Sequence, residues 1–169
     1  GVLDPKMAPF LLALFAFGVG KAALMPIHRW LPAAMVAPTP VSALLHAVAV
    51  VKAGVFTILT VLVYVFGIDF LSSSGASLWL VWLASFTILA SSFVAITKDD
   101  IKARLAYSTI SQLSYIVLGA AIATSVAAQG AALHIVMHAA GKITLFFCAG
   151  AIYVQAHLTK VSELDGQGR

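Results

Sequence analysis

Long apolar stretches alternate with short polar turns along the chain. A membrane-spanning helix needs roughly 20 mostly apolar residues, because the hydrocarbon core of a bilayer is about 30 Å thick. The stretches stay apolar on all sides, which excludes a soluble β fold. We therefore predict an all-α, polytopic transmembrane helical bundle with about five spans, at residues 8–36, 41–66, 77–96, 102–123 and 128–155.

The first of these spans is predicted to be broken. Proline removes a backbone N–H donor and clashes with the preceding turn, so a straight helix cannot contain several prolines in its interior. We expect a helix over residues 8–25, a break, and a short helical piece over residues 27–36. The prolines that break the helix are Pro26, Pro32, Pro38 and Pro40.

The composition indicates an integral membrane protein. Of the 169 residues, 62% are hydrophobic and 9% are charged, whereas soluble domains are about 45–50% apolar and about 25% charged. We expect one membrane domain over residues 1–169, surrounded by the lipid bilayer, with a polar loop at residues 156–169. The opening GVLDPKMAPF has no signal-peptide pattern, and we expect an internal segment of a longer polytopic protein.

Basic residues in the loops predict the orientation of the chain. If the spans alternate, one side of the membrane carries six basic residues and the other carries only Lys6. Cytoplasmic loops have an excess of Lys and Arg, so the loops at residues 98–104 and 157–169 are predicted to be cytoplasmic. The six basic residues are Arg29, Lys98, Lys102, Arg104, Lys160 and Arg169.

Neither nucleic acid binding nor catalysis is indicated. The net charge is +4, but the basic residues are scattered singly and form no patch for nucleic acid. Cys148 is the one cysteine, and the sequence contains no glycine-rich phosphate loop and no nucleophile with a neighbouring base. We predict no catalytic residue and no cofactor in the chain, so an oxidoreductase activity would belong to a surrounding complex.

Three lysines, Lys21, Lys52 and Lys142, fall within the predicted spans. A cation at the bilayer centre costs about 2.5–3.5 kcal/mol on insertion scales, so such residues call for a function. Lys52 and Lys142 are too deep in their spans to reach the interface by snorkelling. For Lys21, which lies close to the proline break, a snorkelling or structural role stays open.

Two histidines extend this pattern. His134, His138 and Lys142 have i, i+4, i+8 spacing and therefore share one face of a helix. Neutral imidazole accepts a proton on one nitrogen and releases one from the other, so we interpret the row as a proton path. Zinc binding is the competing interpretation for the two histidines, but neither a third ligand nor the glutamate of an HExxH motif is present. We predict no metal site.

Other polar residues surround these candidates. His46 and Lys52 lie about 120° apart around their helix, so water or another helix would have to connect them. Span 102–123 carries a polar stripe, which either joins helices or lines a wet cavity; we favour the former. No Asp or Glu falls inside a span, so the buried lysines need partners from elsewhere. The stripe consists of Tyr107, Ser108, Ser111, Gln112, Ser114 and Tyr115.

Three stretches resemble a known family. They are GKAALMPIHRWLPAAMVAPTPVSALLHAVAVVKAGVF, TKDDIKARLAYSTISQLSYIVLG and ALHIVMHAAGKITLFFCAGAI, at residues 20–56, 97–119 and 132–152. Together and in this order, they closely resemble the antiporter-like membrane subunits. Such subunits occur in Mrp-type multisubunit cation/proton antiporters, respiratory complex I and membrane hydrogenases.

The resemblance assigns roles to the candidate residues. Lys21 matches the family's central lysine, which pairs with a glutamate on an earlier helix. His46 and Lys52 match the connecting site, and a lysine at position 52 favours the Mrp branch. His134, His138 and Lys142 match the hydrophilic axis that leads to a second broken helix.

The resemblance also implies a function. We expect a proton-translocating subunit of an Mrp-type antiporter, D-like, in a bacterial inner (plasma) membrane with other membrane subunits as partners. A proton-pumping subunit of NADH:quinone oxidoreductase (complex I) or of a membrane hydrogenase is the alternative, and a non-conducting structural module is the second. Few acceptor oxygens for Na+ are visible, so the sequence supports proton movement better than sodium binding.

Overall fold

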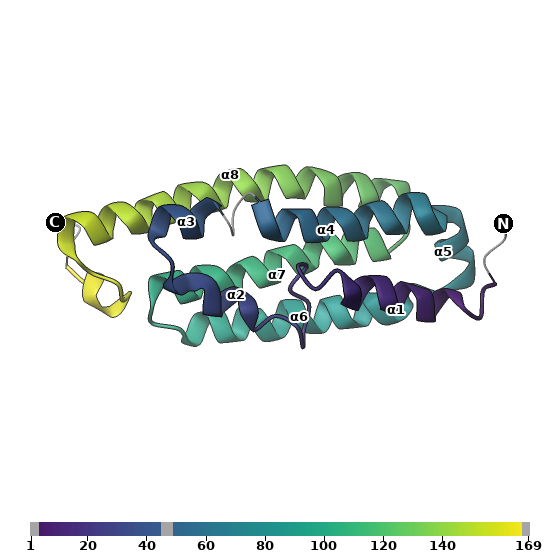
Figure 1. Cartoon of the computed structure of the whole chain (residues 1–169), viewed down its shortest axis with the longest axis horizontal. Helices are drawn as coiled ribbons and strands as arrows, with labels where there is room; N and C mark the ends of the chain where they lie inside the picture. Colours follow the sequence, from purple (N-terminus) through teal and green to yellow (C-terminus); the bar gives the residue numbers. More distant parts are fainter. Residues whose placement is uncertain (1–3, 45–48, 167–169) are drawn as a thin grey trace.

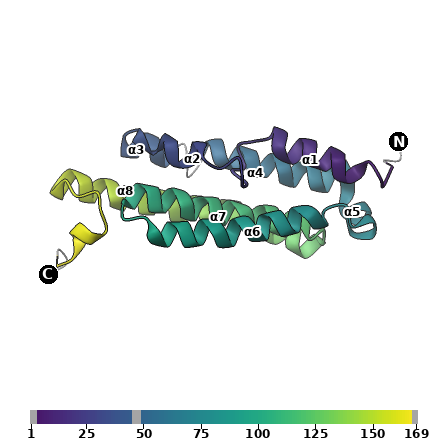
Figure 2. The same cartoon turned by 90° about the horizontal axis from the view of Figure 1, so that it is seen from below.

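The computed structural model describes residues 4–44 and 49–166. Over these residues the chain is helical, and its one β feature is an isolated bridge between Asp100 and Lys160. The helices run along one long axis in two layers, with α1 to α4 in one layer and α6 to α8 in the other (Figures 1 and 2). The predicted all-α helical bundle is confirmed.

The first predicted span is broken, as expected from its prolines. Helix α1 is Ala8–Gly18 and ends earlier than predicted; α2 is Trp30–Ala33 and continues as a 3-10 turn, η1, at Ala34–Val36. Pro26 lies in the irregular segment between α1 and α2. Pro32 lies in the first turn of α2, where a helix loses no hydrogen bond to proline.

The second predicted span, residues 41–66, consists of several helical segments in the structure. Helix α3 is Thr39–Ala43, with Pro38 preceding it in an extended conformation and Pro40 in its first turn. After residues 45–48, helix α4 spans Val50–Thr60, a π-helical segment, η3, spans Val61–Gly67, and α5 spans Ile68–Ser74. The backbone leaves helical geometry at Gly67, with φ +86° and ψ 139°. The stretch expected to be a turn after residue 66 therefore contains a separate short helix, α5, which ends at Gly75 in the left-handed region with φ +65°.

The remaining helices agree closely with the predicted spans. Helix α6 is Leu78–Thr97, α7 is Ile101–Ala121 and α8 is Ser125–Ala156, followed by a short 3-10 turn, η4, at Ser162–Leu164. The carboxylate of Asp100 accepts a hydrogen bond from the Ala103 N–H at 2.7 Å and caps α7. Thr124 caps α8 in the same way, through the Ala127 N–H.

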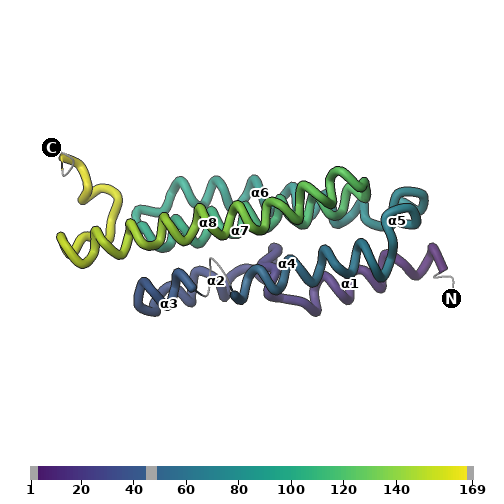
Figure 3. The backbone as a smooth tube through the Cα atoms, turned by 90° about the horizontal axis from the view of Figure 1, so that it is seen from above, coloured from purple at the N-terminus to yellow at the C-terminus, as the bar shows by residue number. Residues whose placement is uncertain are grey.

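Helix α7 lies at the centre of the bundle. It packs against α6 and α8 and also contacts α4 and α2. Its apolar side chains Ile110, Leu113, Ile116 and Val117 are fully buried. Figure 3 shows the same arrangement as a tube, with α6 to α8 stacked over the layer that contains α3 and α4.

Within residues 4–44 and 49–166, three helical segments are long and apolar enough to cross a membrane: Val50–Ser74, Leu78–Thr97 and Ser125–Ala156. Spans at residues 8–36 and 102–123 stay predictions. Large apolar side chains on α6 and α8 are exposed, including Trp82, Phe86, Leu133, Val136 and Met137. Such outward faces are suited to lipid or to further membrane helices.

Candidate functional site

The predicted row of ionisable side chains lies on one face of α8. The imidazole rings of His134 and His138 are parallel, with an interplanar angle of 1° and centroids 6.0 Å apart. His138 and Lys142 are buried, with 8% and 5% of their surfaces exposed. The i, i+4, i+8 spacing therefore places three titratable groups in register inside the bundle.

Lys52 joins this row from α4. Its side chain is buried, and its ammonium Nζ lies in hydrogen-bond contact with Nδ1 of His138. An ammonium can only donate, so Nδ1 is the acceptor and Nε2 carries the ring proton. His138 Nε2 is buried and has no hydrogen-bond partner among the described residues. The contact connects residues 86 positions apart and links α4 to α8.

Helix α7 supplies further partners. Lys142 Nζ donates to Ser108 Oγ at 2.5 Å and to the Leu105 carbonyl at 3.2 Å. His134 Nε2 donates to Oε1 of Gln112 at 2.9 Å. Ser108 and Gln112 belong to the predicted polar stripe, but they were not identified as site residues.

The signal for these two residues was present in the sequence. Ser108 and Gln112 are one helical turn apart, the same interval that separates the titratable residues of α8. The stripe also joins helices, as favoured from the sequence, because Ser111 Oγ lies 2.9 Å from Ser92 Oγ on α6. The other role that the sequence left open, lining a wet cavity, stays a prediction.

The site contains positive charge and no carboxylate. Helices α4, α6, α7 and α8 carry no Asp or Glu. Lys52 and Lys142 repel each other, and both repel a positive charge on His138. In a low-dielectric interior this repulsion is strong, so the protonation of one group depends on the protonation of its neighbours.

Of the other predicted site residues, Lys21 lies outside this cluster. Lys21 is exposed, between α1 and α2, in a shallow cavity of about 380 Å³ that Trp30 and Val50 also line. Its backbone packs closely on α4, since a Cβ added at Gly54 would lie 2.5 Å from the Lys21 carbonyl carbon. His46 falls in residues 45–48, outside the described residues.

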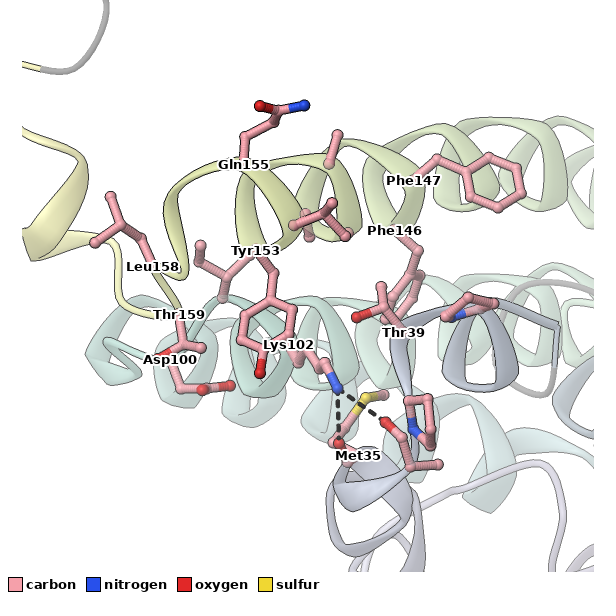
Figure 4. A pocket seen from close by; sticks show the side chains of 18 of the residues that line it. Met35, Thr39, Asp100, Lys102, Phe146, Phe147, Tyr153, Gln155, Leu158 and Thr159 are labelled. Carbon is pink, nitrogen blue, oxygen red and sulfur yellow. Dashed lines mark hydrogen bonds between the residues drawn. The ribbon is translucent and has the colours of Figure 1, made fainter.

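The turn between η1 and α3 is held by a residue of α7. Lys102 Nζ donates to the carbonyl oxygens of Met35 at 3.3 Å and Ala37 at 2.8 Å (Figure 4). The Ser42 hydroxyl also donates to the Ala37 carbonyl, at 3.0 Å. A cavity of about 950 Å³ lies beside these contacts, between residues 35–40 and the last third of α8. Lys102, predicted only as a loop cation, therefore anchors the irregular backbone.

The segment after α8 is hydrogen-bonded to the start of α7 and to the loop before it. Asp99 accepts hydrogen bonds from the Ser162 hydroxyl at 2.7 Å and from the Ser162 N–H at 3.0 Å. These hydrogen bonds lower the pKa of the exposed Asp99 carboxyl below its usual value. The backbone N–H of Ile101 also donates to the Thr159 carbonyl at 2.9 Å.

The sequence predicts no metal site at His134 and His138. Among the described residues, no group of three or more His, Cys, Asp or Glu side chains is placed to hold a metal ion. Nε2 of His134 and Nδ1 of His138 are occupied by protein hydrogen bonds. The arrangement is instead suited to exchanging protons between amines and imidazoles.

Comparison with curated proteins gives relatives of three kinds. The chain is 39% identical over 163 residues to the A/B subunit of the "Probable K(+)/H(+) antiporter" of Rhizobium meliloti, covering 96% of this chain and 16% of the relative. It is 35% identical to the L subunit of the F(420)H(2) dehydrogenase of Methanosarcina mazei, covering 94% of this chain and 23% of that subunit. It is 40% identical to NAD(P)H-quinone oxidoreductase chain 5 of Synechocystis sp., covering 90% of this chain and 21% of that protein.

Solved structures give the same grouping. The Mrp complex from Dietzia sp. DQ12-45-1b contains a chain that superimposes with a TM-score of 0.80 at 37% identity, covering 90% of this chain and 16% of that one. The membrane-bound sulfane sulfur reductase, an archaeal respiratory membrane complex, gives a TM-score of 0.82 at 27% identity, covering 96% and 33%. The chain therefore spans a third or less of the length of these relatives.

A family model settles the assignment. The model described as "NADH:quinone oxidoreductase/Mrp antiporter, TM" matches residues 4–166, nearly the whole chain. The resemblance expected from the sequence is confirmed, and this chain belongs to the NADH:quinone oxidoreductase/Mrp antiporter transmembrane family of integral membrane proteins.

Proposed function

We propose that this chain is the proton-conducting part of an antiporter-like subunit in a multisubunit cation/proton antiporter of the Mrp type. The observation that carries the proposal is the contact between Lys52 of α4 and His138 of α8. It connects two membrane helices through an amine and an imidazole, the two groups best suited to accept and release protons at this depth.

The proposed path passes through His138. Lys52 gives a proton to Nδ1 of His138, which leaves a neutral amine and an imidazolium. His138 then releases the proton from Nε2, which is buried and unpaired among the described residues, toward water shared with His134 and Lys142. Repulsion between Lys52 and Lys142 makes release from one group favourable when the other is charged.

Lys21 and His46 are proposed to belong to the same proton path. Lys21 is exposed on the chain, and its counter-charge would come from a part of the longer protein or from another subunit. The irregular segment around Pro26, together with Pro32, Pro38 and Pro40, would line a hydrated cavity. Irregular backbone at membrane depth is tolerated only where it is buried in protein or lines such a cavity.

The place of the chain in its complex is also proposed. The antiporter relative carries the designation A/B, which supports an A/B-like subunit; the D-like subunit expected from the sequence is the alternative within the same complex. A subunit of a quinone-reducing complex is the alternative outside it, supported by the similarity to NAD(P)H-quinone oxidoreductase chain 5. A membrane hydrogenase and a non-conducting module complete the alternatives.

Membrane, orientation and coupled ion belong to this proposal as well. We propose a bacterial inner (plasma) membrane, other membrane subunits as partners, and cytoplasmic loops at residues 98–104 and 157–169. Protons are the transported species, and Na+ or K+ would be the cation exchanged by the complete complex. The cluster itself offers mainly nitrogen donors and few oxygen ligands, which suits protons better than Na+.

The test uses the complete complex in everted membrane vesicles. Lys52→Met and Lys142→Met are expected to stop cation-induced dissipation of a pH gradient, followed by acridine orange fluorescence, while the complex still assembles. Lys160→Met changes an exposed lysine near the end of the chain and serves as the control. Wild-type transport in both buried-lysine variants would leave only the non-conducting module, and a pH gradient formed on adding NADH would favour the quinone-reducing alternative.

A further inference from the structure

Helix α7 faces the charged row of α8 with neutral oxygen acceptors. Ser108 Oγ and the Leu105 carbonyl both accept from Lys142, and Gln112 Oε1 accepts from His134. Neutral acceptors hold a cationic donor in place without cancelling its charge. The donor therefore keeps its orientation and remains able to lose its proton.

The orientation of the Ser108 hydroxyl is itself fixed. Ser108 Oγ–H donates to the Leu105 carbonyl at 3.0 Å, so its lone pairs are directed elsewhere and accept from Lys142. The Thr109 hydroxyl donates to the same carbonyl at 2.8 Å. Lys142 thus meets a small, fully connected network on α7.

Gln112 fixes the tautomer of His134. Because Oε1 is an acceptor, Nε2 of His134 carries the proton and Nδ1 is left as the accepting nitrogen. Lys52 imposes the same arrangement on His138. Both rings therefore carry their proton on Nε2 and leave Nδ1 as the accepting nitrogen, so each can take up a proton on one nitrogen and release one from the other.

We infer that Ser108 and Gln112 are positioning residues of the proton path: Ser108 orients the amine of Lys142, and Gln112 sets the tautomer of His134. The inference rests on the proposed function and deepens it. Among the described residues, three titratable groups face Lys142 and His134. They are Lys52 from α4, His138 from α8 itself, and Tyr115 of α7, whose ring centroid is 6.5 Å from that of His134. Helix α3, which also packs on α8, carries no titratable side chain.

The experiment for Ser108 compares two side chains of the same shape. Ser108→Val and Ser108→Thr differ in whether a hydroxyl is present, and both are introduced into the full-length protein in its complex. Ser108→Val is expected to lower the cation-induced proton flux about tenfold, since a hydrogen bond to a charged group is lost. Ser108→Thr is expected to restore most of the flux. Equal, wild-type flux in both variants overturns the role of Ser108.

The experiment for Gln112 uses the same logic. Gln112→Asn keeps a neutral amide oxygen on the helix face that meets His134, whereas Gln112→Leu removes it. We expect Gln112→Leu to lower the flux and to change its pH profile, and Gln112→Asn to keep more of the flux. Wild-type flux and pH profile in Gln112→Leu overturn the role of Gln112.

Two controls separate positioning from general damage. Ser114→Ala removes a buried hydroxyl that bonds only to the Ile110 carbonyl of its own helix, and Gln155→Leu changes an exposed glutamine at the end of α8. Both are expected to transport normally. If Ser108→Val or Gln112→Leu prevents assembly of the complex, Ser108→Ala and Gln112→Met are measured against the same criteria.

This inference and the proposed function can fail separately. Loss of transport in Lys142→Met together with normal transport in Ser108→Val and Gln112→Leu overturns the positioning roles and leaves the proton path standing. Normal transport in Lys142→Met overturns the proton path, and the positioning roles with it.

Discussion

Two buried lysines in a site without carboxylates are the central feature of this chain at the scale of single residues. Lys52 is held by an imidazole nitrogen and Lys142 by a hydroxyl and a carbonyl. A lysine paired with a carboxylate is stabilised in its charged form, whereas neutral partners leave both protonation states accessible. The contacts therefore favour amines that exchange protons over amines that form permanent ion pairs.

A change from lysine to arginine at position 52 tests whether proton release matters. Arginine keeps the positive charge and the donors, but its guanidinium does not deprotonate in proteins. Lys52→Arg is therefore expected to assemble and to lower proton flux by about a hundredfold, the scale of lost acid–base function. Flux is measured in vesicles with Lys98→Arg as the control, and normal flux in Lys52→Arg would contradict a proton-releasing role.

Sequence reasoning found the row on α8 because helical spacing is a local property. The i, i+4, i+8 pattern of His134, His138 and Lys142 predicts one face without any knowledge of the fold. The pairing of Lys52 with His138 could not be predicted, because it depends on how α4 packs against α8. Ser108 and Gln112 were seen as part of a stripe, but their partners become visible only once α7 lies beside α8.

At the scale of elements, one glycine allows α4 to approach the broken segment. A Cβ at Gly54 would lie 2.5 Å from the Lys21 carbonyl carbon and 2.6 Å from the Ala22 nitrogen, both backbone atoms that cannot move aside cheaply. Gly54→Ala is expected to destabilise the protein by about 1–3 kcal/mol, as overpacking does. In thermal unfolding of the purified complex, its midpoint should therefore fall.

The matched control for this change is Gly130→Ala, on α8. A Cβ at Gly130 meets no other atom within 4 Å, and alanine is favoured over glycine in a helix by about 1 kcal/mol. The thermal unfolding midpoint of Gly130→Ala should stay the same as that of the wild type or rise. A Gly54→Ala midpoint equal to that of the wild type would contradict the close packing between α4 and the segment at Lys21.

Lys102 is expected to hold the turn between η1 and α3, at residues 35–37. Lys102→Met removes both hydrogen bonds to the Met35 and Ala37 carbonyls, and hydrogen bonds to charged groups contribute about 1.5–3 kcal/mol. Hydrogen–deuterium exchange across residues 34–40 should become about tenfold faster or more. Lys98→Met is the control, and unchanged exchange in Lys102→Met would show that Lys102 does not anchor the segment.

The prolines explain why the elements were predicted with unequal success. Pro26, Pro32, Pro38 and Pro40 mark a break in any fold, so the short piece ending at Val36 was expected. The extension through Ile68–Ser74 was not, because serines and a glycine are typical of turns. There the chain turns at Gly67, with φ +86°, and then forms the short helix α5, which the apolar pattern does not reveal.

At the scale of the whole molecule, the two layers meet along α7 and α8, and the first residues of α7 contact both the turn at residues 35–37 and the segment after α8. Asp99 ties that segment to the loop between α6 and α7 through Ser162. Because the pKa of Asp99 is lowered in the folded chain, the tie is complete at neutral pH. It is lost as the pH falls from the usual Asp value, about 3.8, through the lowered pKa.

This tie predicts a local effect of acid. Hydrogen–deuterium exchange of residues 157–166, corrected for the chemical exchange rate, should rise at acid pH in the wild type. In Asp99→Asn the rise should be absent, since the ionisable group is gone. Asp165→Asn, which changes an exposed carboxylate, is the control, and an identical acid response in Asp99→Asn would show that another group is responsible.

The proton path between the two layers is tested most directly at His138, where α4 and α8 meet. His138→Gln keeps a polar side chain that can accept from Lys52 but cannot carry a proton through, and His157→Asn, at the exposed end of α8, is the control. The measurement is cation-induced proton flux by the complete complex reconstituted in liposomes. The structure predicts an assembled His138→Gln complex with flux reduced about a hundredfold and normal flux for His157→Asn. Normal flux in His138→Gln would contradict proton transfer between Lys52 and α8.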